Sequence, residues 1–305
     1  MAEGVRPAKK VLLSKRMQML ADMVTAGSRV ADVGCDHAFL SIYLVQAGMC
    51  PKCLAMDVRR GPLSGAEEHI AAYGLGEYIE TRLSDGLTAY HIGEAQTLVC
   101  SGMGGRLMKR ILEEGGDKTR SFTELILQPQ SEIPEFRIFL RETGFLVTEE
   151  EAVYEEGKYY FAMKAVYAGQ RKPAEQGMPS AAGEPAGQGM PSGSGEPIGQ
   201  EMPSAAGEPI GQRTVLTGSI PAEHSAVPEK GLPMEQELYD LFGKLLLQKR
   251  HPVLKQYLLN GVETMGKIIA QLQRQDSPKG EARLRELLQE KRQLEKALEF
   301  WGKGR

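Results

Sequence analysis

Three aspartates at or near the ends of short apolar runs carry the clearest chemical signal in this sequence. Asp32 ends the first of these runs, Asp57 ends the second, and Asp85 follows the third. Parallel strands of a doubly wound sheet present their carboxyl ends along one crevice, where ligands bind. If the three runs are such strands, we expect the three carboxylates to face one ligand.

The turn after the first run, Gly34-Cys-Asp-His-Ala38, indicates the kind of ligand. Gly34 and Ala38 are small enough for a ligand to approach the backbone closely. A dinucleotide site would offer glycine amides to a pyrophosphate, but Asp36 and His37 stand here instead, and carboxylates repel phosphates. Carboxylates suit the ammonium and sulfonium cations of S-adenosylmethionine (SAM), so the turn predicts a SAM site.

Asp57 and Asp85 are expected to bind different parts of SAM. Asp57 stands about 20 residues after the first glycine, where doubly wound folds place a carboxylate against ribose hydroxyls. Asp85, in Ser84-Asp-Gly-Leu87, can accept from the adenine amino group. The residues predicted to bind the cofactor are Asp32, Gly34, Asp36, Asp57, Asp85, Gly86, Gly102 and Met103.

A fourth apolar run ends in Cys100-Ser-Gly-Met-Gly-Gly105. Its glycines predict an open backbone beside the point of methyl transfer, with Met103 as an apolar cover. Enzymes that methylate exocyclic amines often carry Asn/Asp-Pro-Pro-aromatic at this place, and this chain does not. Enzymes that methylate pyrimidine carbon use a cysteine nucleophile. Cys100 lies inside an apolar run, so we interpret it as a packing residue.

The elements that must position these residues follow from hydrophobic periodicity. Strands are expected at 29–32, 53–57, 79–83, 97–101 and 125–128, and helices at 39–48, 63–73, 105–114 and 132–143. This alternation predicts a mostly parallel sheet. Two further runs, 145–154 and 158–167, predict an antiparallel closing hairpin. The expected fold is α/β, a Rossmann-like SAM-dependent methyltransferase sheet.

Three zones divide the chain. Residues 1–168 form the expected SAM-binding domain. Residues 169–233 repeat Met-Pro-Ser and Gly-Glu-Pro with a period of twelve, contain no Phe, Trp or Tyr and have few branched apolar residues, which predicts a disordered linker. Residues 234–305 predict two long helices around a short turn near Asp276, an α-helical hairpin of coiled-coil type. This last zone is net basic, with 14 Lys and Arg against 10 Asp and Glu; most of these cations are expected to form a solvated face, and contact with nucleic-acid phosphates is the alternative.

Composition limits the remaining possibilities. The 305-residue chain has a formal net charge of −3, which by itself gives no sign of nucleic-acid binding. Four cysteines and no hydrophobic signal segment near Met1 indicate a cytoplasmic protein. Cys50 and Cys53 lack the further ligands that a zinc site needs, so we expect no metal. No apolar run approaches the roughly 18 residues of a membrane span.

With these residues in view, the sequence resembles the bacterial tRNA (adenine(22)-N1)-methyltransferases of the TrmK family. The matching segments are Leu13-Ser-Lys-Arg16, Val30-Ala-Asp-Val-Gly-Cys-Asp-His-Ala-Phe-Leu40, Ser84-Asp-Gly-Leu87, Ser101-Gly-Met-Gly-Gly105, Leu127-Gln-Pro-Gln130, Gly144-Phe-Leu-Val-Thr-Glu149, Glu156-Gly-Lys-Tyr-Tyr160 and Glu237-Leu-Tyr-Asp-Leu-Phe-Gly243. Two departures are that Gln130 replaces an expected Asn and that Asp57 stands where the family often has Glu.

The resemblance implies direct methyl transfer from SAM to adenine N1 of tRNA. Because N1 has its own lone pair, the enzyme has to expose and align the base rather than generate a nucleophile. Asp36, His37 and Gln128 are the candidate catalytic residues, with orienting roles. Arg16 is expected to contact tRNA phosphates, and the C-terminal helical hairpin at 234–305 is a candidate tRNA contact. Gly104 and Gly105 are assigned to the substrate side.

Two other functions remain open at this point. The chain could be a SAM-dependent methyltransferase of another RNA position or of a small molecule. It could also be a catalytically silent protein that binds SAM or RNA.

Overall fold

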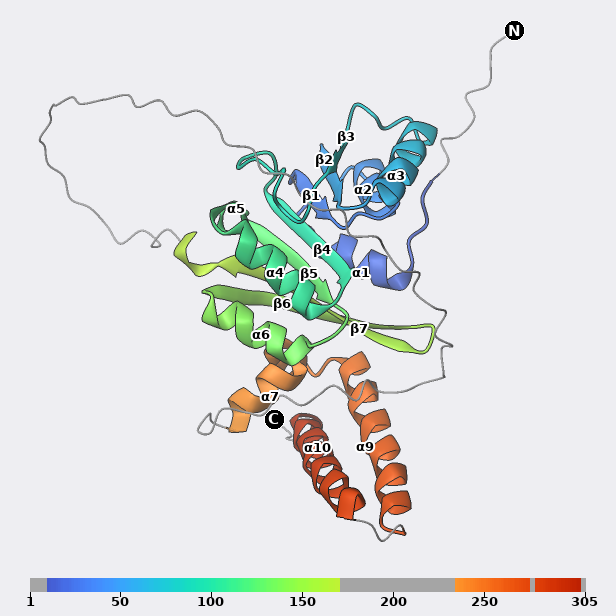
Figure 1. The fold of residues 1–305 in the computed structure, drawn as a ribbon, viewed down its shortest axis with the longest axis vertical. Coiled ribbons are helices and arrows are strands. Elements are labelled where there is room, and N and C mark those ends of the chain that lie inside the picture. The colour runs from blue at the N-terminus through green and yellow to red at the C-terminus, as the bar shows by residue number, and fades with distance from the viewer. Residues whose placement is uncertain (1–9, 171–233, 275–277, 303–305) are drawn as a thin grey trace, which may run out of the picture. The chain divides into compact units, whose positions relative to one another are not determined.

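The computed structural model describes residues 10–170, 234–274 and 278–302, and these fall into one compact unit built on a seven-stranded sheet (Figure 1). The strands are β1 (Val30–Val33), β2 (Cys53–Asp57), β3 (Ile79–Leu83), β4 (Thr97–Met103), β5 (Glu124–Pro129), β6 (Phe145–Glu155) and β7 (Lys158–Tyr167), in the order β3-β2-β1-β4-β5-β7-β6. Strands β1 to β5 are parallel, and the β6–β7 hairpin joins β5 in antiparallel direction. The predicted Rossmann-like fold is confirmed.

Helices cover both faces of the sheet. One layer holds α1 (Lys15–Met23), α2 (Phe39–Gln46) and α3 (Arg60–Ala72), and the other holds α4 (Gly105–Gly115), α5 (Asp117–Ser121) and α6 (Ile133–Glu142). Successive strand residues serve opposite layers: Val99 packs with the first, and Leu98 and Cys100 pack with the second. A sheet buried on both faces requires continuous apolar strands, and this explains the uninterrupted runs in the sequence.

The strand predictions agree closely with the structure, but helices α1 and α5 were not predicted. Strands β2 and β3 have the predicted bounds, whereas β1 lies one residue later than expected, so that Asp32 is inside the strand rather than at its end. Helix α1 begins after Ser14, whose hydroxyl accepts from the amide of Met17 over 3.3 Å. This is an ordinary N-cap, but α1 is only 9 residues long and its apolar pattern is weak.

The C-terminal zone differs from the predicted pair of long helices. The first of them is interrupted twice, which gives α7 (Met234–Phe242), α8 (Lys244–Gln248) and α9 (Pro252–Leu272) before α10 (Pro278–Gly302). Gly243 and Arg250 adopt positive φ angles of 88° and 53°, and Pro252 starts α9. Helices α9 and α10 lie side by side as a helical pair (Figure 1).

The low-complexity linker predicted for 169–233 lies outside the described residues from residue 171 onward, and the two domain boundaries stay predictions. Over the ranges that the structure describes, no helix is long and apolar enough to cross a membrane. Within the same ranges, no group of three or more His, Cys, Asp or Glu side chains is placed to hold a metal ion. All four cysteines are free and buried, including Cys100 in β4.

Candidate active site

The chain reverses its direction of strand addition between β1 and β4, and this switch point is where doubly wound folds bind ligands. Asp32 of β1 is buried here, and Ser41 of α2 donates to its Oδ2 over 2.7 Å. Burial is the main cause that raises the pKa of Asp32 to about 6; the Ser41 hydrogen bond opposes it, and the nearby Asp57 carboxylate adds to it. Two carboxylates held together in a buried place fit a cationic ligand.

Asp57 ends β2 with a carboxylate that is 5 % exposed. Its Oδ1 accepts from the amide of Arg59 over 2.9 Å and lies 3.8 Å from Nε of the same residue. The next residue, Val58, is 57 % exposed although it is apolar. Sequence reasoning missed Val58, and the available signal was an apolar residue directly after the strand-end carboxylate.

Asp85 and Gly86 follow β3. The carboxylate of Asp85 is half exposed, and Arg110 of α4 donates to its Oδ1 over 3.1 Å. The sequence did not indicate this ion pair. Gly86 is buried, and a Cβ at this position would lie 3.1 Å from Ile111. The loop at Gly86 therefore packs tightly on α4. The Arg110 contact involves only Oδ1 of Asp85, so Oδ2 can accept from a ligand.

Gly34 and Met103 meet at the mouth of the switch point. A Cβ on Gly34 would lie only 2.9 Å from Cε of Met103. Met103 is brought there by a bulge in β4, where the register against β5 shifts between Ser101 and Met103 and Gly102 takes a φ of +79°. The apolar side chain predicted to cover the site thus lies against the predicted cofactor turn.

Gln128 and Arg16, which sequence reasoning treated separately, form one pair. Gln128 is fully buried in β5, and Nη1 of Arg16 donates to its Oε1 over 3.1 Å. Nη1 of Arg16 also lies 3.6 Å from the position that a Cβ on Gly102 would take, and Nε2 of Gln130 lies 3.9 Å from it. The Gln130 that departs from the family pattern is therefore close to the same bulge.

Asp36 and His37 form the second half of the cofactor turn, next to α3. Asp36 has a φ of 50° and an exposed carboxylate, 3.9 Å from Nε2 of His37. Nδ1 of His37 would be 2.7 Å from a Cβ on Gly65 of α3, and its backbone oxygen lies 3.3 Å from Nδ1 of His69. The contacts of His37 are thus with α3, whereas those of Gln128 are with α1.

Gly104 and Gly105 open α4. A Cβ on Gly104 would lie 3.0 Å from Oγ of Ser131, and one on Gly105 only 2.5 Å from the backbone oxygen of Ser131. A side chain at position 105 would clash with the loop after β5, and this explains why the residue there is glycine. Contact of either glycine with a substrate stays a prediction.

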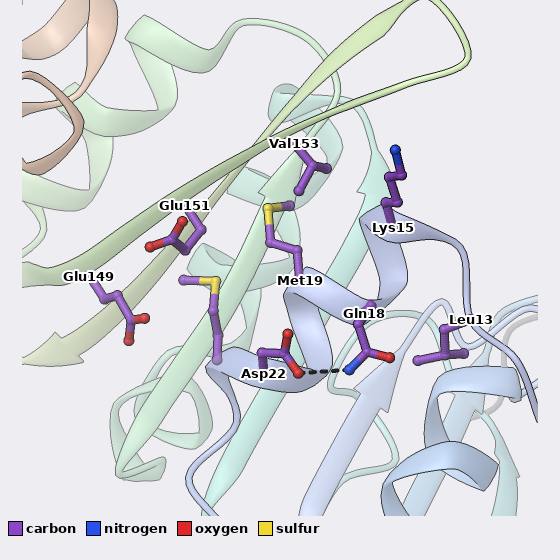
Figure 2. A pocket seen from close by; sticks show the side chains of 9 residues that line it. Leu13, Lys15, Gln18, Met19, Asp22, Glu149, Glu151 and Val153 are labelled. Carbon is purple, nitrogen blue, oxygen red and sulfur yellow. Dashed lines mark hydrogen bonds between the residues drawn. The ribbon is translucent and has the colours of Figure 1, made fainter. Parts of the chain in front are cut away.

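A groove of about 560 Å³ lies between α1 and β6 (Figure 2). Its lining mixes apolar side chains with charged ones: Leu13, Lys15, Gln18, Met19, Asp22, Met23, Glu149, Glu151 and Val153. No predicted site residue is among them. Because its rim carries three carboxylates, the groove does not suit a nucleic acid.

Comparison with known proteins identifies the family of the chain. A sequence family described as "Methyltransferase domain" matches residues 13–163. The tRNA (adenine(22)-N(1))-methyltransferase of Bacillus subtilis is 36 % identical over 171 residues, which are 56 % of this chain and 71 % of that protein.

Two solved structures share the fold over nearly the whole chain. Streptococcus pneumoniae Sp1610, a candidate tRNA (m1A22) methyltransferase solved with S-adenosyl-L-methionine, is 25 % identical, with a TM-score of 0.64 over 94 % of this chain and 100 % of that one. Bacillus subtilis TrmK is 23 % identical, with a TM-score of 0.64 over 95 % and 100 %. The 36 % identity to the Bacillus subtilis enzyme, over 71 % of that protein, shows that the chain belongs to the tRNA (adenine(22)-N1)-methyltransferase family, TrmK.

Proposed function

We propose that the chain transfers the methyl group of SAM to N1 of adenine 22 in tRNA, at the carboxyl ends of β1, β2 and β4. This is the activity that the name of the Bacillus subtilis relative states. The single observation that carries the proposal is the buried pair of carboxylates, Asp32 and Asp57, beneath the Gly34 turn. The reaction takes place in the cytoplasm in this proposal, and the four free thiols fit a reducing compartment.

The residues at the switch point fit SAM. Asp32 has a hydroxyl and a second carboxylate as neighbours, so a sulfonium or ammonium cation would relieve its unfavourable burial. In this proposal Asp57 accepts from the ribose hydroxyls, the exposed Val58 packs on a face of the adenine, and the Asp85 oxygen outside the Arg110 contact accepts from the adenine amino group. SAM supplies an activated methyl group when it is bound.

On the substrate side, the protein has to align a base rather than activate it. Adenine N1 carries a lone pair, so displacement needs no general base. Gln128 has no exposed surface, so we propose that it acts through Arg16: its Oε1 holds the half-buried guanidinium next to Gly102, where the cation can bind a phosphate of the target nucleotide. Asp36 and His37 are proposed to orient the target nucleotide from the opposite side of the turn.

The decisive experiment incubates the protein with tritiated SAM and tRNA transcripts. We expect transfer to a transcript with adenine at position 22 and none to a matched transcript with guanine there. Label on both transcripts would point to another RNA position. Label on small metabolites alone would favour a different substrate class, and SAM binding without any transfer would favour a silent binding protein.

SAM affinity is expected to rise with pH up to about pH 7. In the free protein the pKa of Asp32 is about 6, so at lower pH the carboxyl is mostly protonated and has to lose its proton when a cation binds. Affinity should therefore fall by up to about tenfold for each pH unit below 6 and be constant above 7. Calorimetric titration between pH 5 and 8 measures this, and Asp32→Asn should remove the dependence. A flat profile for the unmodified protein would contradict the role of Asp32.

Replacing Asp36 or His37 by Ala is expected to lower kcat roughly ten- to hundredfold because the base is less well aligned. The dissociation constant of SAM should change by less than about threefold for His37→Ala, since His37 packs on α3 rather than on the carboxylate pair. His91→Ala, at an exposed histidine beyond β3, is the matched control. Single-turnover rates and SAM titration separate the two effects, and unchanged turnover would exclude the orienting role.

A further inference from the structure

The tip of the β6–β7 hairpin holds the first turn of α1. The carboxylate of Glu155, the last residue of β6, accepts from the amide of Lys15 over 2.6 Å and from that of Arg16 over 3.2 Å. The first amides of a helix have no partner within the helix, and a carboxylate there also interacts favourably with the helix dipole. Glu155 therefore fixes the backbone of Arg16 from 139 residues away in the sequence.

The same hairpin supports the side chain of Arg16. Tyr160 of β7 lies under its guanidinium, with 5.7 Å between Cζ and the ring centroid. This distance is within the range of a cation–π contact. Glu155 and Tyr160 stand on either side of the hairpin turn, so one short structural unit fixes both the backbone and the side chain of Arg16.

Arg16 in turn fixes the orientation of the Gln128 amide. Its Nη1 donates to Oε1 of Gln128, while Nε2 of Gln128 donates to the backbone oxygen of Pro129 over 3.2 Å. If the amide rotated by half a turn, its NH₂ group would face the Arg16 donor and its oxygen would face the Pro129 oxygen. Both contacts would then be unfavourable, so Arg16 keeps the acceptor oxygen on its own side, beside Gly102.

We propose that Glu155 and Tyr160 are positioning residues for methyl transfer: they hold Arg16 against Gln128 at the bulge of β4 and so keep its half-buried guanidinium in place for the target nucleotide. This inference rests on the proposed function of Arg16 and Gln128. It assigns part of the substrate side to the antiparallel hairpin rather than to the parallel strands. Neither residue touches the reacting atoms in this assignment.

Kinetics of variants test the proposal. Glu155→Ala and Tyr160→Leu are expected to lower kcat on tRNA roughly ten- to hundredfold, since small displacements of positioning groups have effects of this size. The dissociation constant of SAM should stay the same. Tyr160→Phe keeps the ring and should retain most activity, and Glu155→Gln keeps one acceptor and should lie between Ala and the unmodified protein. Glu156→Asn removes the neighbouring exposed carboxylate at a positive-φ position that Asn tolerates, and serves as the control.

A double-variant cycle distinguishes positioning from general damage. In an Arg16→Ala background, Glu155→Ala should produce no further loss of kcat, because its effect passes through Arg16. Hydrogen exchange at the amides of Lys15 and Arg16 should be faster in Glu155→Ala, with or without tRNA. Additive losses, or slow exchange together with unchanged kcat, would overturn the inference.

The outcome for Arg16→Ala shows which proposal has failed. If Arg16→Ala lowers kcat and Glu155→Ala does not, the positioning role is wrong and the proposed function stands. If neither Arg16→Ala nor Gln128→Ala affects transfer by an active protein, the substrate side itself is misassigned, and the positioning role is excluded with it.

Discussion

Replacing Arg137 by Met is expected to lower the free energy of unfolding by about 3–5 kcal/mol, because it leaves a buried carboxylate without its cation. Arg137 of α6 and Glu150 of β6 are 7 % and 2 % exposed, and Nε of Arg137 donates to Oε1 of Glu150 over 2.9 Å. Removing one member of such a pair is more damaging than removing both, since the remaining charge stays buried.

This ion pair also joins the C-terminal helices to the sheet. Nη1 of Arg137 donates to the backbone oxygens of Asp240 and Leu241 at the end of α7, over 3.2 and 3.0 Å. Oε2 of Glu150 accepts from the amide of Leu245 in the first turn of α8 over 3.0 Å. The cation thus meets the negative end of one helix and the carboxylate the positive end of the next, as helix dipoles favour.

Urea unfolding followed by two probes measures the loss. Far-UV circular dichroism reports on the whole chain, and the single tryptophan, Trp301 in α10, reports on the C-terminal helices. In Arg137→Met we expect the fluorescence transition to move to lower urea than the dichroism transition, which would show that α7 to α10 separate first.

Two variants control for this experiment. The double variant Arg137→Met, Glu150→Leu should recover part of the stability because no buried charge remains. Arg283→Met removes a partly exposed cation of α10 that pairs with Glu286, and should change stability by less than about 1 kcal/mol. If Arg137→Met is no more harmful than Arg283→Met, the pair does not stabilise the junction.

The second large effect is expected for Asp57→Ala, which should weaken SAM binding by about a hundredfold. Two hydrogen bonds from ribose hydroxyls to a carboxylate would together contribute about 3 kcal/mol, and this corresponds to roughly two factors of ten in affinity. The carboxylate is nearly buried and already ordered by the amide of Arg59, so little entropy is lost when the ligand binds.

Calorimetric titration of SAM measures the affinity of this variant. Asp117→Ala is the matched control, because it removes an exposed aspartate at the start of α5 that has no place at the switch point. Its dissociation constant should equal that of the unmodified protein. A fully folded Asp57→Ala protein with unchanged affinity would rule out the ribose contact.

The parallel sheet and the position of the cofactor turn could be predicted from sequence because they depend on local patterns. Strands buried on both faces have to be continuously apolar, and β2 therefore begins and ends where its apolar run does. The places of Asp57 and Asp85 follow directly, because residues after a parallel strand lie at the ligand-binding edge.

The C-terminal helices show where local reasoning was insufficient. Leucines at helical spacing continue through Gly243, and a single helix across it was the simplest prediction. The structure breaks there because Glu150 occupies the space: a Cβ on Gly243 would lie 2.5 Å from its Oε1. A carboxylate from a strand 93 residues earlier decides the end of α7 and the start of α8, and no local pattern contains it.

The sequence by itself determined the class of the protein: its apolar runs specify the sheet, and its aspartates and glycines specify a site for a cation-bearing adenosine. Only the tertiary structure decided how the substrate side is built. Arg16 and Gln128 are 112 residues apart, and the hairpin residues Glu155 and Tyr160 bring them together. Contacts of this kind depend on how helices and strands pack, and hydrophobic periodicity, which records only which face of an element is buried, does not specify them.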